Sequence, residues 1–74
     1  MDIKKENFKR ISENRVSKIL AMLAQLTNLG NSSFYEYTDE DIKKIFKAIE
    51  LETKKSKDTL LRRNRKKNLK RFEL

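Results

Sequence analysis

Hydrophobic residues recur along the first third of the chain at the spacing of a helix. At about 100° per residue, one half of the circumference collects Phe8, Ile11, Val16, Ile19, Leu20, Leu23 and Leu26. This pattern predicts an amphipathic helix. Ser12 and Arg15 lie on the same side and weaken its beginning, so the prediction is strongest from about Asn14 to Asn28. Gly30 is expected to end the helix.

A second hydrophobic stripe predicts a second helix. Its members are Ile42, Ile45, Phe46 and Ile49. Thr38, followed three residues later by Asp41, has the spacing of a capping box, and the acidic residues of this first turn suit the positive end of a helix dipole. The stripe thins beyond Leu51. From about Lys54 we expect the chain to be frayed, or helical only when bound to a partner.

The two predicted helices define an all-α fold, a helical hairpin with a basic, partly helical C-terminal extension. The connection, from about Leu29 to Tyr37, has turn composition, and the rings of Phe34, Tyr35 and Tyr37 are expected to fold back onto the helices. The two stripes together exceed what one hairpin can hide from water. We therefore expect a symmetric homodimer, with two hairpins forming a four-helix bundle.

Composition excludes several classes of protein. A chain of 74 residues has room for one domain, and it contains no Pro, Cys or His. Neither a disulfide nor a zinc site of Cys and His ligands is available. The longest hydrophobic run, residues 19–24, is far shorter than the roughly 20 residues of a membrane-spanning helix. With no secretory signal recognisable either, we expect a cytoplasmic protein.

The net charge of +8 is carried by one end of the chain. Residues 1–53 contain nine basic and nine acidic side chains, which cancel, whereas residues 54–74 contain ten basic side chains against Asp58 and Glu73. This asymmetry predicts a neutral helical hairpin domain, 1–53, and a basic C-terminal tail, 54–74. A localised positive potential attracts polyanions.

The basic tail is the candidate nucleic-acid-binding site. Its cations are Lys54, Lys55, Lys57, Arg62, Arg63, Arg65, Lys66, Lys67, Lys70 and Arg71. Such a run can neutralise phosphates and release their counterions. Phe72 alone cannot form a stacking platform, which argues against single strands as the main ligand. The tail does not distinguish DNA from RNA, and a simple solubilising tail is the alternative reading.

Catalysis is not expected. The cluster Glu36, Asp39, Glu40 and Asp41 could suggest a metal site, but carboxylates in the first turn of a helix are better explained by capping. Tyr35 or Tyr37 could in principle act as a nucleophile, yet there is no His with which to build a site around either of them. No phosphate-binding loop or nucleophile motif is present. We therefore predict no catalytic residues, no metal and no cofactor.

Two other functions remain open at this point. The tail could dock on an acidic partner protein, with Phe34, Tyr35 and Tyr37 anchoring an inhibitor or adaptor. It could also attach electrostatically to an anionic membrane surface, although without Trp and with a poor hydrophobic stripe beside the basic run. A helix-turn-helix is disfavoured, because the connection is longer than the three or four residues of that motif.

Four segments carry a resemblance to a known group of proteins. They are Asn14-Arg15-Val16, Leu26-Thr27-Asn28-Leu29-Gly30-Asn31-Ser32-Ser33, Tyr35-Glu36-Tyr37-Thr38-Asp39-Glu40-Asp41 and Lys44-Ile45-Phe46-Lys47-Ala48-Ile49-Glu50. Residues 14–52 thereby resemble small uncharacterised all-helical proteins encoded on bacterial plasmids, conjugative elements and phages. The resemblance implies an accessory protein of a mobile element. It brings no activity and no site residues, and the basic tail lies outside it.

Overall fold

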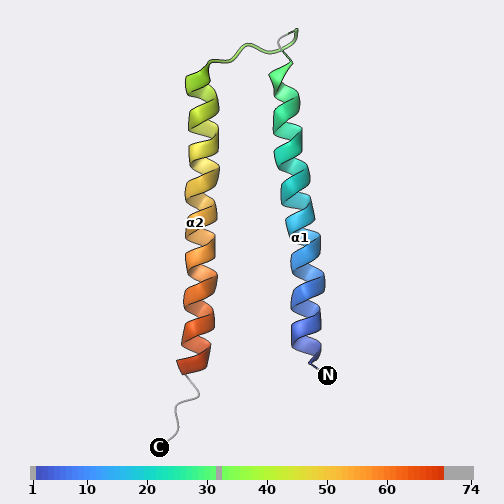
Figure 1. Ribbon diagram of the computed structural model, residues 1–74, viewed down its shortest axis with the longest axis vertical. Coiled ribbons are helices and arrows are strands. Elements are labelled where there is room, and N and C mark those ends of the chain that lie inside the picture. Colours follow the sequence, from blue (N-terminus) through green and yellow to red (C-terminus); the bar gives the residue numbers. More distant parts are fainter. Residues whose placement is uncertain (1, 32, 70–74) are drawn as a thin grey trace, which may run out of the picture. The chain divides into compact units, whose positions relative to one another are not determined.

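The computed structural model describes residues 2–31 and 33–69, and this part of the chain is all-α (Figure 1). Helix α1 spans Ile3–Thr27, a short 3-10 helix η1 spans Asn28–Gly30, and helix α2 spans Asp39–Leu69. None of the described residues forms a strand. The predicted all-α class is confirmed. The chain divides into two units, Met1–Glu36 and Tyr37–Leu74, each built on one long helix.

Helix α1 begins earlier than the hydrophobic pattern alone indicated. Asp2 has an extended backbone and caps the helix, since its carboxylate accepts hydrogen bonds from the backbone N–H of Lys4 at 3.0 Å and of Lys5 at 3.4 Å. A side-chain acceptor at this position satisfies donors that a helix start leaves without partners. Most of the polar residues before Asn14 are Lys, Arg or Glu, which are good helix formers, so the helix extends back to Ile3.

Helical structure ends at Gly30, as predicted, but not through the left-handed glycine that often closes a helix. The backbone N–H of Asn28 donates to the carbonyl oxygens of Gln25 and Leu26, and the N–H of Asn31 donates to Asn28 O at 3.4 Å. Gly30 does not adopt a positive φ. The chain therefore closes α1 by tightening into the 3-10 turn η1.

The connection after η1 is organised around Asn31. Its side-chain oxygen accepts from the N–H of Ser33 at 3.0 Å, and its carbonyl oxygen accepts from the N–H groups of Phe34 and Tyr35, both at 3.1 Å. The aromatic rings that follow are not covered. Phe34 is 79% exposed, Tyr35 51% and Tyr37 44%. Within its own unit, Phe34 is not covered by α1, contrary to the prediction that these rings fold back onto the helices.

The predicted capping box at the start of α2 is confirmed. The N–H of Asp41 donates to the Thr38 hydroxyl oxygen at 3.1 Å, and the N–H of Thr38 donates to the Asp41 carboxylate at 3.0 Å. The backbone N–H of Ile42 donates to Thr38 O at 3.2 Å. The hydroxyl, N–H and carbonyl groups of Thr38 thus all form hydrogen bonds with the first turn, and α2 begins at Asp39.

The C-terminal half of α2 differs from the prediction. The segment expected to fray from Lys54 is helical as far as Leu69, without a break at residues 53 and 54. Lys, Arg and Leu are strong helix formers, and this segment contains neither Gly nor Pro. Backbone propensity therefore continues the helix where the hydrophobic stripe no longer supports it.

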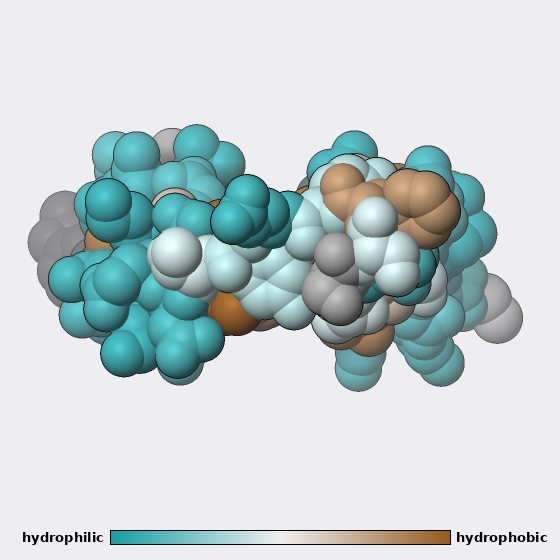
Figure 2. All heavy atoms as spheres, turned by 90° about the horizontal axis from the view of Figure 1, so that it is seen from above, coloured by the Kyte–Doolittle hydropathy of each residue, from teal (hydrophilic) through white to brown (hydrophobic). Residues whose placement is uncertain are grey.

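Neither helix has a buried side chain among the described residues. Leu23 and Leu26 on α1 and Ile49 on α2 are partly covered, and the other large hydrophobic side chains are exposed. In the view of Figure 2, hydrophilic residues cover most of α2, whereas hydrophobic residues gather at the linker end of α1. Neither described helix is hydrophobic over a long enough stretch to cross a membrane.

Candidate nucleic-acid interface

Most of the predicted site residues lie on the C-terminal half of α2. Those with described side chains are Lys54, Lys55, Lys57, Arg62, Arg63, Arg65 and Lys66, and we call them the tail cations. Lys67 belongs to α2 by its backbone, while Lys70 and Arg71 lie outside the described residues. The run that was predicted to be frayed, or helical only when bound, is therefore an array on a continuous helix, which fixes the order and spacing of its charges.

The tail cations are exposed and free of ion pairs with the described carboxylates. Each of them is classed as exposed. Within the described part of the chain, the one ion pair joins Lys43 Nζ to Glu40 Oε1 at 4.0 Å, and it lies near the start of α2. The tail cations therefore keep their charge available for an external anion, since none of them forms an ion pair with a described carboxylate.

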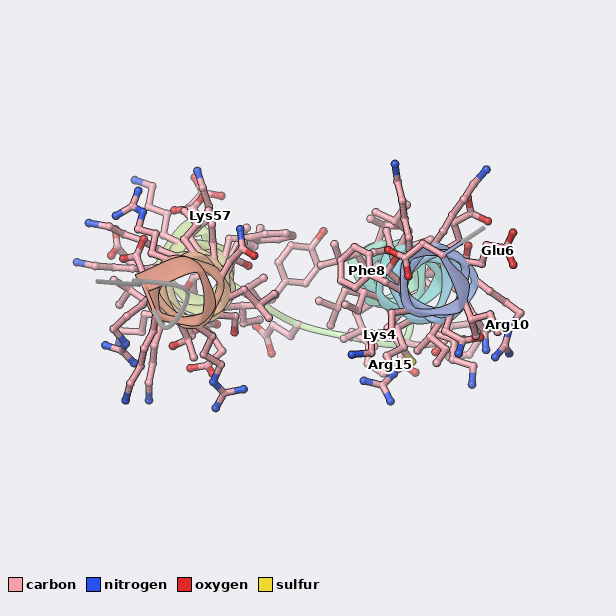
Figure 3. The ribbon with its side chains drawn as sticks, turned by 90° about the horizontal axis from the view of Figure 1, so that it is seen from below. Lys4, Glu6, Phe8, Arg10, Arg15 and Lys57 are labelled. Carbon is pink, nitrogen blue, oxygen red and sulfur yellow. The ribbon has the colours of Figure 1, made fainter. Side chains whose placement is uncertain are left out.

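The tail cations surround most of the helix. With about 100° per residue, five of them fall within an arc of about 120°, while Lys57 and Arg63 lie on other sides. Figure 3 shows side chains with nitrogen ends radiating from α2 in several directions, Lys57 among them. A helix with this distribution can meet phosphates on more than one side at once, as it would inside a groove.

The same array destabilises the helix that carries it. Arg62 stands one turn from both Arg65 and Lys66, and Arg63 stands one turn from Lys66. Like charges at these spacings cost a few tenths of a kcal/mol per pair in an exposed helix. Asp58 offsets part of this repulsion from a position four residues before Arg62. A bound polyanion would remove the rest, so ligand binding and helix stability are coupled in this segment.

Helix α1 is also amphipathic, but its charges are mixed. Phe8 lies on the opposite side of the α1 ribbon from Glu6 and Arg10 (Figure 3). Lys4 and Arg15 project from a further side of the same helix. With acidic and basic groups interspersed, α1 does not offer the uninterrupted positive potential of the tail cations.

The acidic cluster is explained by the start of α2. Asp41 bonds Thr38, and Glu40 pairs with Lys43, so two of the four carboxylates have local structural roles. In the described part of the chain, no three acidic side chains gather closely enough to hold a metal ion. The roles that the geometry shows within this cluster are capping by Asp41 and charge pairing by Glu40.

Two cations that the sequence interpretation left out share a face with five of the seven tail cations. Lys44 and Lys47 lie on the first half of α2, and both are exposed. They were missed because the charge was divided by position along the chain, and residues 1–53 sum to zero. Their position on the helical wheel of α2 was the signal that could have identified them.

Fold and site together define a small all-α protein whose second helix is strongly basic along its C-terminal half. No protein-family model, no curated protein and no solved structure matches the chain. The resemblance to proteins of mobile elements therefore stays a prediction, and the functional argument depends on the geometry of α2.

Proposed function

We propose that the chain is a non-catalytic nucleic-acid-binding accessory protein of a bacterial mobile element, contacting phosphates through the basic part of α2. The observation that carries this proposal is the exposure of the tail cations without ion pairs on a regular helix. Phosphate contacts by Lys and Arg provide most of the affinity of non-specific nucleic-acid binding. Lys67, Lys70 and Arg71 add three further positive charges to the segment in this proposal.

The hydrophobic faces of α1 and α2 support a second part of the proposal, a hairpin that dimerises. The denser parts of the two stripes are residues 16–26 on α1 and 42–49 on α2, and both lie close in sequence to the connection between the helices. In the proposed hairpin, antiparallel pairing of the helices would bring these two segments opposite each other. Exposed stripes of this kind usually mark an interface, and a symmetric four-helix bundle would cover them.

Full-length variants with matched charge test the role of the tail cations. One variant replaces Arg62, Arg63, Arg65 and Lys66 by Gln, and the control replaces Lys9, Arg10, Arg15 and Lys18 by Gln. Both lose four positive charges, so net charge alone would weaken them equally. We expect the α2 variant to lose at least tenfold in affinity in mobility-shift titrations with duplex DNA, and the α1 control to lose less than threefold.

Helicity is measured on both variants by circular dichroism, so that loss of binding is not confused with unfolding. Equal affinity of the two variants would contradict a role for α2 as the binding element. The same titrations with structured RNA and single strands identify the preferred ligand.

A second function is favoured by the exposed aromatic rings of the connection. With Phe34 79% exposed and Tyr35 51% exposed, a protein partner could bury both. Aromatic residues often dominate binding energy at protein interfaces. In this alternative the chain is an inhibitor or adaptor docking on an acidic partner protein. Phe34→Ser would then abolish partner binding while leaving the mobility shift intact, whereas the four-residue α2 variant would affect both.

A further inference from the structure

A strip of seven exposed cations runs along one side of α2 from near its start to Lys66. At about 100° per residue, the seven fall within an arc of about 120°. They are Lys44, Lys47, Lys54, Lys55, Arg62, Arg65 and Lys66, and we call them the basic strip. Between Lys44 and Lys66, Asp58 is the one carboxylate within this arc. The strip thus joins both halves of the helix, across the boundary that composition placed at Lys54.

The basic strip lies opposite the hydrophobic stripe of the same helix. Ile42, Ile45, Phe46 and Ile49 centre about 170° away from the middle of the strip on the helical wheel. Ile49 is the one partly covered residue among them, and Ile42 and Ile45 are 38% and 43% exposed. A partner helix packed on the hydrophobic stripe would leave the strip facing solvent, so the two surfaces of α2 can be occupied together.

The strip is long enough to reach several successive phosphates of a nucleic-acid duplex. From Lys44 to Lys66 the helix rises by about 33 Å at 1.5 Å per residue. One turn of B-form DNA spans about 34–36 Å. Because α2 is unbroken between these residues, the cations hold a fixed spacing along this length. A flexible tail could adapt to any polyanion, whereas cations held at fixed spacing on an unbroken helix favour a polyanion with regularly spaced phosphates, such as a duplex.

The shape of the groove and the residue types select among nucleic acids. The major groove of B-DNA, about 12 Å wide, admits an α-helix, whereas that of A-form RNA is too deep and narrow for side chains to read. Single strands are usually held by stacked aromatic rings, and the strip contains none. Arg63 and Lys57, on other sides of the helix, would meet the far wall of a groove.

We propose that the ligand is double-stranded B-form DNA, bound along α2 with Lys44 and Lys47 contacting phosphates as the tail cations do. This inference rests on the proposed function and deepens it in two respects. It names duplex DNA as the ligand, and it moves the interface from the tail alone to nearly the whole helix.

The experiment measures how the affinity of the full chain for a 20-base-pair duplex depends on salt, by fluorescence anisotropy. Each lost phosphate contact makes the negative slope of log Kobs against log salt shallower by about 0.9. Lys44→Gln with Lys47→Gln should make the slope shallower by about 2 per bound chain. The matched control, Lys9→Gln with Lys18→Gln, removes the same charge from α1 and should make the slope shallower by less than about 0.5.

Charge-preserving variants separate contact from folding. Lys44→Arg with Lys47→Arg keeps both positive charges, so it should retain the slope of the unaltered protein. If these side chains acted only by supporting the structure, the slope would not depend on their charge.

An unchanged slope in the Gln variant would overturn the extended interface while leaving the tail as the binding element. Equal affinity for the duplex, its separated strands and an RNA duplex of the same sequence would overturn the assignment to DNA. Absence of binding to all of them would overturn the proposed function as well.

Discussion

Thr38 and Asp41 illustrate how far single residues could be interpreted from the sequence. Their spacing predicted a capping box, and both hydrogen bonds of that box are present. A local motif of this kind is predictable because it depends on residues three positions apart. Asp2 was not recognised as a cap, although it bonds Lys4 and Lys5, because no strong hydrophobic stripe follows it to indicate a helix start.

The cap makes a direct prediction about stability. Thr38→Ala removes the hydroxyl that accepts from the N–H of Asp41, and should lower the free energy of unfolding by about 1 kcal/mol. Thr53→Ala is the matched control, since the Thr53 hydroxyl donates to Ile49 O inside the helix, where Ala is the better helix former. Urea unfolding followed by circular dichroism at 222 nm, at one fixed protein concentration, measures both. A Thr38→Ala loss no greater than that of Thr53→Ala would contradict the capping role.

Both helices were predicted as elements, and both are longer than their hydrophobic stripes. The stripes locate residues that can be buried, but they do not limit the backbone. Helix α1 extends back to Ile3 and α2 extends to Leu69 on the propensity of Lys, Arg, Glu and Leu in a chain without Pro. Helix bounds were therefore poorly predicted wherever propensity and hydrophobic pattern disagree, as they do beyond Lys54.

Continuity of α2 is testable by a proline in its middle. Ser56→Pro removes a backbone donor and clashes with the preceding turn, at a cost of about 3 kcal/mol or more within a helix. We expect a marked loss of the 222 nm signal and weaker DNA binding, because the two halves of the basic strip would lose their common axis. Ser56→Ala controls for the loss of the hydroxyl and should retain both. An unchanged signal in Ser56→Pro would show that α2 is not one continuous helix in solution.

At the scale of the whole molecule, the sequence predicted the class of fold but could not place the site completely. The tail cations were found because they are clustered in one short stretch of the sequence. Lys44 and Lys47 were not, because their membership of the site depends on the shared face of an unbroken helix. Association between chains is also a whole-molecule property, and the exposed stripes of α1 and α2 are the reason to expect it.

The proposed dimer is tested by placing a charge on each side of α1. Leu23 lies on the hydrophobic side and is partly covered, so Leu23→Glu should convert the dimer to monomer. Ala21 lies on the polar side of the same helix, and Ala21→Glu should leave the dimer intact. Sedimentation at tens of micromolar measures the mass of each. A folded monomer of the unaltered protein, independent of concentration, would contradict the four-helix bundle.

The central claim is that the cations of α2 bind the phosphates of nucleic acid, and the salt dependence of binding tests it most directly. With five or more phosphates neutralised per chain, log Kobs for duplex DNA should fall linearly with log salt at a slope of about −4 or steeper. We predict this slope for the full chain between about 50 and 200 mM salt. A slope near zero, or no binding at the lowest salt, would contradict the account.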